Sequence, residues 1–473
     1  MIKPSITLSF IFILIFFQAE IHAQNRAPAF PRLLPDPKAL EYFHLGNNAI
    51  YSWTALAEIS LWASGDTSIS GLNRILAIRE DIKNRADFPE SDRDRAEYIL
   101  SYMHKNILRS YSIYQTRLDT LLSGGRYNCV SSSVLYMILC KSFDILTFGV
   151  ITKDHAFVTV HIGESVIDVE TTNSFGFDPG NRREFHDQFG RITGFAYVPA
   201  QNYRDRQQIS PIALVSLILN NRISDLERQG RWADAVPVAI DRAALLAGSS
   251  LAVTDDSSSF GHLFKDPRQD LLDRLFNYGA SLLRANREED CILWAAAASP
   301  LYPDNERWQD FIMAALNNRI ARFIRERKIT EAKNFLENYK IILSEENYFK
   351  LDILTTDAFI LNSANQIRSS AEGDAVLNAI EQAFASGKMN EERVSELRTY
   401  TVHRTASALS AASNQARDWR AAIAYIENAI AGFGSNRDLE QALRTYRGNL
   451  AADYHNRFAA EWNRRNYEEL NAY

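Results

Sequence analysis

The chain has 473 residues, 46% of them hydrophobic and 23% charged, with a formal net charge of −6 at pH 7. Such a length allows roughly two or three folded domains with a sizeable core, and the composition is typical of a folded protein. The negative net charge, and the lack of a long basic stripe with interleaved aromatic residues, argue against a nucleic-acid partner.

Residues 1–23 have the pattern of an export signal. Lys3 supplies a positive start, residues 6–17 are mostly apolar, and Ala23 stands at a suitable cleavage position. The apolar run is shorter than the ~20 residues that cross a bilayer, although an uncleaved anchor is the alternative interpretation. We expect an exported protein, periplasmic or extracellular, with no membrane span once the signal is removed.

Cysteine usage does not indicate a disulfide-built protein, although export brings oxidising conditions. Cys129, Cys140 and Cys291 are odd in number and far apart. In one helix, Cys129 and Cys140 would be ~16 Å apart by helical rise, beyond the ~7 Å limit between the Cα atoms of a disulfide. We therefore expect a free thiol at Cys129 and interpret Cys291 as a small buried residue.

Residues 24–37, rich in Pro and Ala, are interpreted as a linker, and residues 40–122 have a helical pattern. The sequence SGGRYN at residues 123–128 breaks this pattern with two glycines. After it, apolar residues on several faces predict a helix that begins near Cys129 and is buried on most sides.

From residue 146 to residue 172 the apolar period becomes two, which predicts strands, and residues 194–199 have the same character. Gly163 and Glu164 suit a two-residue type II′ hairpin turn. In that register the numbers of paired residues sum to 327, and one face of the hairpin is apolar and packs on the core. This apolar face comprises Ala156, Val158, Val160, Ile162, Ile167 and Val169.

The opposite face of the hairpin carries His155 and two carboxylates. Glu170 is diagonal to His155 at ~7–8 Å between backbones, within reach of two long side chains. Asp168 is two pairs along, ~13 Å away by strand rise. Geometry favours Glu170 as the partner of His155, but a β-bulge would change the register, so Asp168 stays the alternative.

Cys129 stands where a nucleophile is activated. At a helix N-terminus the dipole and free backbone N–H groups favour a thiolate, and a neighbouring histidine serves as base and then as acid. A carboxylate holds the imidazole tautomer, and the N–H of Cys129 can donate to an oxyanion. We therefore expect Cys129, His155 and Glu170 to form a triad for thiol acyl-transfer chemistry.

These residues also have structural interpretations. Cys129 is alternatively a buried thiol, His155 a satisfied core histidine, and His161 a solvated strand tip. A metal site of Cys129, His155 and His161 is disfavoured because no tight ligand spacing such as H-E-x-x-H is present. We expect neither a metal nor another cofactor.

After about residue 210 the pattern predicts helices, with a loose internal repeat. Asn221–Trp232, Asn318–Ile329 and Asn456–Tyr467 each run from Asn-Arg to a bulky residue eleven positions later, and in the first two Ala235 and Ala332 follow. This arrangement resembles the tetratricopeptide repeat, in which small residues lie where paired helices touch. The resemblance implies a domain that binds a protein or peptide partner.

The sequence GGRYNCVSSSVLY, followed by HAF and VETT, resembles the transglutaminase-like core, which is related in fold to papain-type cysteine proteases. It is most similar to the SirB1-type branch, where this core precedes tetratricopeptide repeats. The resemblance implies Cys129 as nucleophile and His155 as base, and VETT places Glu170 where the family has the Asp of VDPT. Phe157 replaces the family's usual Trp.

The expected fold is therefore α+β. A transglutaminase-like, papain-like core with a helical N-terminal part covers residues 38–206, and an all-α tetratricopeptide-like repeat domain covers residues 207–473. The expected function is an exported cysteine hydrolase, a peptidase or amidase, with a protein or peptide partner on the repeats. Because the nucleophile is often absent in the SirB1-type branch, an inactive protein-binding scaffold is the first alternative. A protein-crosslinking acyltransferase is the second.

Overall fold

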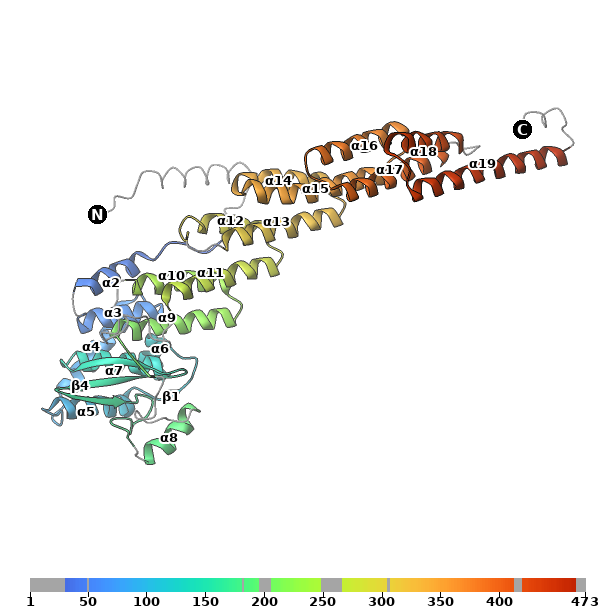
Figure 1. Ribbon diagram of the computed structural model, residues 1–473. Helices are drawn as coiled ribbons and strands as arrows, with labels where there is room; N and C mark the ends of the chain where they lie inside the picture. Colours follow the sequence, from blue (N-terminus) through green and yellow to red (C-terminus); the bar gives the residue numbers. More distant parts are fainter. Residues whose placement is uncertain are drawn as a thin grey trace. The chain divides into compact units, whose positions relative to one another are not determined.

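The computed structural model describes residues 30–48, 51–180, 183–194, 206–247, 266–303, 307–411 and 419–464. The chain divides into two compact units, one comprising residues 1–290 and 297–305 and the other residues 291–296 and 306–473. The described residues are mostly helical with a small sheet (Figure 1). The expected signal peptide and nearly all of the expected strand at residues 194–199 lie outside the described residues.

The region with a helical pattern, residues 40–122, is helical as predicted. Two of its helices begin at serine caps. The Ser52 hydroxyl accepts a hydrogen bond from the N–H of Ala55, and the Ser91 hydroxyl accepts one from the N–H of Asp94. Two short parallel strands, β1 (Ser110–Tyr111) and β2 (Arg126–Tyr127), precede and follow the last helix. The helices are α2 (Pro37–Asn48), α3 (Trp53–Ser64), α4 (Ile69–Lys83), α5 (Asp92–Asn106) and α6 (Leu118–Gly124).

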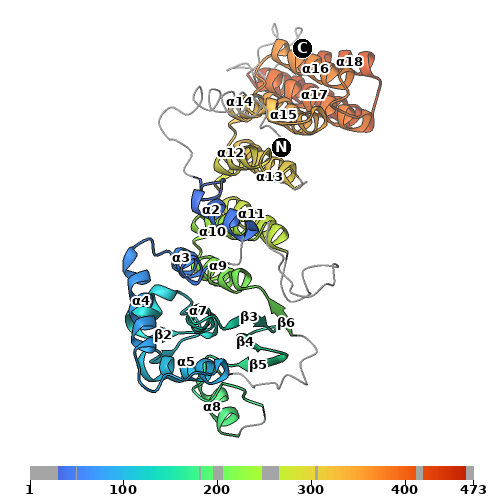
Figure 2. The same ribbon diagram turned by 90° about the vertical axis from the view of Figure 1, so that its left-hand side faces the viewer.

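Helix α7 (Cys129–Lys141) is the centre of the first unit. Every residue from Val130 to Cys140 is buried, which confirms the prediction of a helix covered on most sides. It packs against α3, α5 and α9 (Pro211–Arg228) as well as the strands β3 (Leu146–Ile151) and β4 (Ala156–Ile162). Figure 2 shows α7 against one side of the four-stranded sheet. A shift of the helix along its axis would expose apolar residues to water, so the burial of this run fixes the position of the helix N-terminus.

The sheet has the strand order β5-β4-β3-β6, and all neighbouring strands are antiparallel. The predicted hairpin register is confirmed, because β4 and β5 pair from Ile162↔Ser165 to Val158↔Val169. Gly163 has the positive φ of 57° that the first position of a type II′ turn requires. The strands are β3 (Leu146–Ile151), β4 (Ala156–Ile162), β5 (Ser165–Val169) and β6 (Gln207–Ile209).

The apolar face of the hairpin packs on the core as predicted, with Val158, Val160 and Val169 fully buried. The opposite face is also covered, since Phe157 and Thr159 are buried. A helix that the pattern did not predict, α8 (Arg183–Thr193), follows the hairpin. The sheet is therefore covered on both faces near His155, not solvated on one.

The repeat motif marks the turn between two helices. In its first copy, α9 (Pro211–Arg228) ends before Trp232, where α10 (Trp232–Leu246) begins. In its second copy the same turn joins α13 (Trp308–Arg325) to α14 (Ile329–Asn338), and the small residues Ala235 and Ala332 are buried as expected. The end of the third copy, residues 465–467, lies outside the described residues.

The remaining helices follow in chain order, and consecutive helices of the second unit from α13 on pack on each other. Among the described helices, none combines the length and apolar character needed to cross a membrane. They are α11 (Pro267–Arg284), α12 (Glu288–Ala298), α13 (Trp308–Arg325), α14 (Ile329–Asn338), the 3₁₀ helix η2 (Lys340–Ile342), α15 (Glu345–Asn365), α16 (Ser370–Ala385), α17 (Glu391–Ala411), α18 (Trp419–Phe433) and α19 (Arg437–Asn463).

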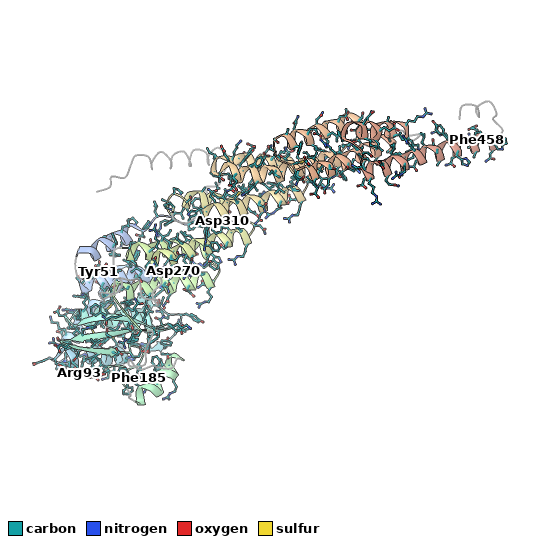
Figure 3. The ribbon with its side chains drawn as sticks, in the orientation of Figure 1. Tyr51, Arg93, Phe185, Asp270, Asp310 and Phe458 are labelled. Atoms are coloured by element: carbon teal, nitrogen blue, oxygen red, sulfur yellow. The ribbon has the colours of Figure 1, made fainter. Side chains whose placement is uncertain are left out.

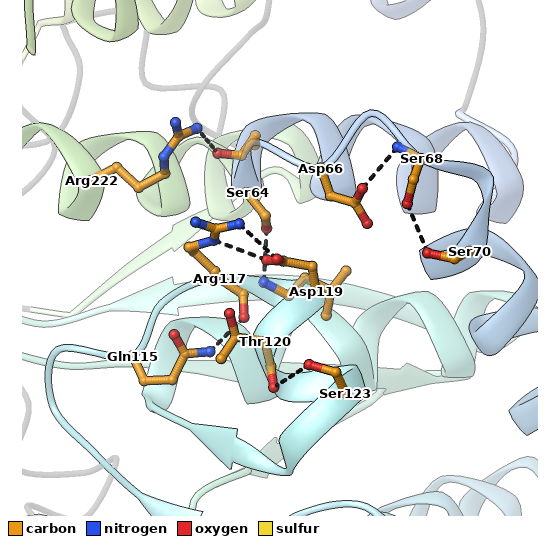
Figure 4. Close-up of polar contacts among 12 residues, drawn as sticks. Ser64, Asp66, Ser68, Ser70, Gln115, Arg117, Asp119, Thr120, Ser123 and Arg222 are labelled. Atoms are coloured by element: carbon orange, nitrogen blue, oxygen red, sulfur yellow. Dashed lines mark hydrogen bonds and ion pairs between the residues drawn. The ribbon is translucent and has the colours of Figure 1, made fainter. Parts of the chain in front are cut away.

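The first repeat helices belong to the same compact unit as the sheet, so the division between the units does not coincide with the expected boundary at residues 206 and 207. Arg222 of α9 donates to the Ala63 carbonyl at the end of α3, 2.5 Å away (Figure 4). The described part of the expected linker is also anchored, because Arg32 forms an ion pair with Asp241 of α10 at 2.7 Å. These contacts hold α9 and α10 on the helical N-terminal part.

Replacing the buried Ala332 by leucine tests whether small residues are required where the repeat helices touch. We expect Ala332→Leu to lower the free energy of unfolding by about 1–3 kcal/mol, because the larger side chain overpacks a closed contact. Urea unfolding followed by circular dichroism measures it. Ala371→Leu, at an exposed position of α16, is the control and should change stability little. Equal midpoints for the two variants would contradict the prediction.

Candidate active site

Cys129 is the first residue of α7, and its position is fixed by a capping box. The Asn128 side chain accepts hydrogen bonds from the N–H groups of Val130 and Ser131, and the Ser131 hydroxyl accepts one from the N–H of Asn128. The Cys129 side chain is half-buried. Its own N–H has no acceptor in the described part of the chain, so this donor remains for a ligand.

His155 and Glu170 form the buried pair that the hairpin register predicted. The Nε2 atom of His155 is 2.6 Å from Oε2 of Glu170, and the two side chains are only 8% and 1% exposed. Both residues lie just beyond the paired part of β4 and β5. The alternative acid, Asp168, accepts two hydrogen bonds from Arg206 instead, at 2.7 and 2.5 Å. The structure therefore brings Glu170, and not Asp168, to His155.

The electrostatics of this pair favour a charged imidazole. Burial lowers the pKa of His155, but the charge of Glu170 and the hydrogen bonds with Cys129 and Glu170 outweigh burial and raise that pKa well above its usual range. Burial raises the pKa of Glu170, although the neighbouring His155 opposes this. The two groups therefore share one proton. This proton is on the imidazole of His155 when the carboxylate of Glu170 is ionised.

The second ring nitrogen of His155 is available to the thiol. Because Nε2 is engaged by Glu170, Nδ1 is the nitrogen that exchanges a proton with Cys129, whose side chain neighbours the ring. The charged imidazole is then the form in which this proton is on Nδ1. Nδ1 is buried and makes no hydrogen bond of ordinary geometry to any described residue. Such contacts are often long in a free enzyme and tighten when substrate binds.

The turn that carries Glu170 is tightly held. A Cβ at Gly176 would lie 1.9 Å from the Glu170 carbonyl oxygen, so only glycine fits where the turn folds back. The hydroxyl of Thr171 bonds to Ser132 and Ser133 of α7, at 2.8 and 2.9 Å. The same helix thus presents Cys129 and positions the residue next to Glu170.

A second histidine has a structural role in this turn. The Nε2 atom of His104 in α5 is 3.1 Å from the Thr171 carbonyl oxygen. Burial lowers the pKa of His104 to about 4, although the Thr171 carbonyl opposes the shift. His104 is therefore neutral near pH 7 and donates its Nε2–H to Thr171. Sequence reasoning did not identify it, because no spacing relates residue 104 to residue 171.

A pocket of about 440 Å³ opens on Cys129 and His155. The turn between β3 and β4, residues 151–156, lines one side. Helix α9 lines another, Arg242 of α10 and Asp270 of α11 also contribute, and Ile113 and Tyr114 lie in the lining as well. Arg242 and Asp270 form a buried ion pair at 2.9 Å, and Asp270 is labelled in Figure 3. Sequence reasoning missed the contribution of α9, since its residues are about ninety positions after Cys129 and only the tertiary fold brings them together.

His161 stands apart from this constellation. It pairs with Leu146 at the turn end of the hairpin, and its half-buried ring packs on Phe148 with 4.9 Å between centroids. The interpretation as a solvated tip was thus only partly right. Within the ranges that the structure describes, no group of three or more His, Cys, Asp and Glu residues is placed to hold a metal ion.

Comparisons with family models, with curated proteins and with solved structures find no match to this chain. The resemblance to the transglutaminase-like core accordingly stays a prediction from the sequence motifs. The geometry of Cys129, His155 and Glu170 is an observation of the structure and does not depend on that resemblance.

The raised pKa values of His155 and Glu170 predict how stability varies with pH. A group whose pKa is raised in the folded state adds to the free energy of unfolding. This addition is complete below the pKa of the unfolded state, near ~6.5 for histidine, and is lost as pH rises through the pKa of the folded state. Glu170→Gln leaves a buried imidazole without its counter-charge, which costs about 3 kcal/mol. We therefore expect the wild-type advantage over Glu170→Gln to be largest near pH 6 and to shrink towards pH 9.

Thermal unfolding of both proteins from pH 5 to pH 9 measures this difference. Asp168→Asn is the matched control, because it removes the other carboxylate of the same hairpin, which bonds to Arg206 and not to His155. Its stability difference from wild type should not follow this pH course. A gap between wild type and Glu170→Gln that stays constant, or widens with rising pH, would contradict the assigned pair.

Proposed function

We propose that this protein is a cysteine hydrolase, a peptidase or amidase, that uses Cys129 as nucleophile, His155 as base and acid, and Glu170 as the group that orients the imidazole. One observation carries the proposal. The buried His155–Glu170 pair, at 2.6 Å, adjoins a half-buried cysteine at a helix N-terminus, and both Cys129 and His155 line an open pocket. Perturbed titratable groups that converge on a pocket are the usual mark of an active site.

The proposed chemistry proceeds in two steps. The Cys129 sulfur, after passing its proton to Nδ1 of His155, attacks a carbonyl carbon, and the N–H of Cys129 can stabilise the oxyanion. The imidazolium then gives its proton to the leaving amine as the C–N bond breaks, which leaves a thioester on the sulfur. In the second step His155 takes a proton from water, the hydroxide displaces the sulfur, and the acid product leaves.

The sequence resemblance supports the same reading and extends it. A transglutaminase-like core of the SirB1 type implies this triad, and the helical repeats imply a bound protein or peptide partner. The N-terminal sequence implies that the protein acts outside the cytoplasm. We propose these features together with the hydrolase, and the tests below address the chemistry first.

Alkylation of Cys129 by iodoacetamide tests the thiol–imidazole pair. A cysteine without such a neighbour is only a few per cent thiolate at pH 7. We expect Cys129 to react at least ~10-fold faster at pH 7 than it does in His155→Ala. Burial raises the pKa of the Cys140 thiol to about 12, so Cys140 is an unreactive internal control. Peptide mapping by mass spectrometry gives the rate at each site, and equal rates in wild type and His155→Ala would refute the pair.

The reaction itself is tested with a mixture of peptides from a digested proteome. We expect the wild-type protein to produce new amino termini that Cys129→Ala does not produce, detected by mass spectrometry. Adding a biotinylated primary amine separates the alternatives. Incorporation of the amine in place of water would show acyl transfer. A Cys129 thiol that reacts with iodoacetamide, while no peptide is cleaved and no amine is incorporated, would favour the protein-binding scaffold.

A further inference from the structure

The side of the pocket formed by α9 is one continuous face of that helix. Its pocket-lining positions run from Leu217 to Arg228 at intervals of three and one, which is the spacing of a single helical face. The interval of eleven residues from Leu217 to Arg228 (228 − 217) spans ~16 Å at the rise of an α-helix. An extended chain advances ~3.3 Å per residue, so this face can accompany about five residues of an extended peptide. The positions are Leu217, Asn220, Asn221, Ser224, Asp225 and Arg228.

The charges around the pocket compensate one another. The charged imidazole of His155 is balanced by Glu170 behind it. The rest of the lining has three cationic side chains and three carboxylates, and four of these six form ion pairs within the lining. Arg228 pairs with Asp225, and Arg242 pairs with Asp270 at 2.9 Å. The remaining two, Lys153 and Asp154, are adjacent and of opposite sign. The pocket therefore lacks a net charge that would select a charged ligand.

Neutral polar groups of α9 are left to bind a ligand. The half-buried Asn220 and the exposed Ser224 make no side-chain hydrogen bond to any described residue. Asn221 donates its amide N–H to the Thr116 hydroxyl at 3.1 Å, which leaves its carbonyl oxygen as an acceptor. Amide and hydroxyl side chains both donate and accept. A peptide backbone, which alternates donors and acceptors, is the ligand that matches them.

The rim of the pocket adds apolar surface. Tyr114 is 68% exposed, and the guanidinium of Arg228 lies 4.0 Å from the centre of its ring. Ile113, also in the lining, is 50% exposed. The Arg228–Tyr114 contact joins α9 to the segment before α6, so both sides of the pocket contribute to one surface. Exposed large apolar side chains beside a pocket suit uncharged side chains of a bound peptide.

We infer that α9 is the substrate-binding wall of this site, and that it holds an extended, uncharged peptide segment by its backbone through Asn220 and Ser224. The segment then runs along α9 and presents a carbonyl group to Cys129. This inference rests on the proposed function for the chemical step, whereas the binding of the segment does not require turnover. In this arrangement the first repeat helix is part of the active site.

Affinity labelling of the full-length protein tests the inference. Two reagents that alkylate Cys129 are compared at pH 7, iodoacetamide and an N-iodoacetyl tetra-alanine amide, which is an uncharged extended peptide. We expect the peptide reagent to show saturation and a higher second-order rate constant than iodoacetamide. Asn220→Ala and Ser224→Ala should each reduce this ratio of rate constants about 2- to 10-fold, the effect of one ordinary hydrogen bond.

The chain supplies a matched control in its second unit. The sequence LNNRI occurs at residues 219–223 and again at residues 316–320, so Asn317 of α13 is the counterpart of Asn220. Asn317 does not line this pocket, and Asn317→Ala should leave the ratio unchanged. An unsaturable peptide reagent, or the same ratio in wild type, Asn220→Ala and Ser224→Ala, would overturn the inference.

The two reagents keep this inference apart from the proposed function. The iodoacetamide rate reports the reactivity of the Cys129 thiol, and the ratio reports the peptide-binding wall. A slow iodoacetamide reaction with a ratio that depends on Asn220 would refute the hydrolase and support the wall. A fast iodoacetamide reaction with a ratio independent of Asn220 would do the reverse.

Discussion

The complete burial of α7 is the constraint on which the site depends. Because the helix is covered by α3, α5, α9 and the sheet, it cannot shift along its axis without exposing apolar residues to water. Its N-terminus is fixed further by the reciprocal hydrogen bonds of Asn128 and Ser131. Cys129 is therefore presented by a buried helix whose N-terminus is held by a capping box, and such support fixes the position of a side chain.

The same helix also holds the turn that carries Glu170. Ser132 and Ser133 bond to Thr171 beside Glu170, so Cys129 and this turn are both positioned by the first residues of α7. Oε1 of Glu170 is buried without a hydrogen bond to any described residue, and Nδ1 of His155 has none of ordinary geometry there. Buried polar groups are nearly always satisfied, and exceptions occur at functional sites. Both atoms belong to the buried pair that adjoins Cys129.

The first helix after the sheet, α9, forms part of the pocket. It packs on α3 and α7 and also lines the pocket, and Arg222 donates a hydrogen bond to the end of α3. A ligand bound along this part of α9 would therefore lie in the pocket that Cys129 also lines.

The sequence by itself determined the local features. The two-residue alternation around Gly163 predicted the hairpin register, because side chains alternate between the two faces of a strand. That register favoured Glu170 as the partner of His155 and left Asp168 as the alternative, and the structure decided for Glu170. The apolar residues on several faces of the segment after Cys129 likewise predicted a helix that is buried on most sides. What only the tertiary structure decided was the pocket and the Thr171 contacts. These join α9, His104 and α7 across long stretches of chain, where no periodic pattern relates one residue to another.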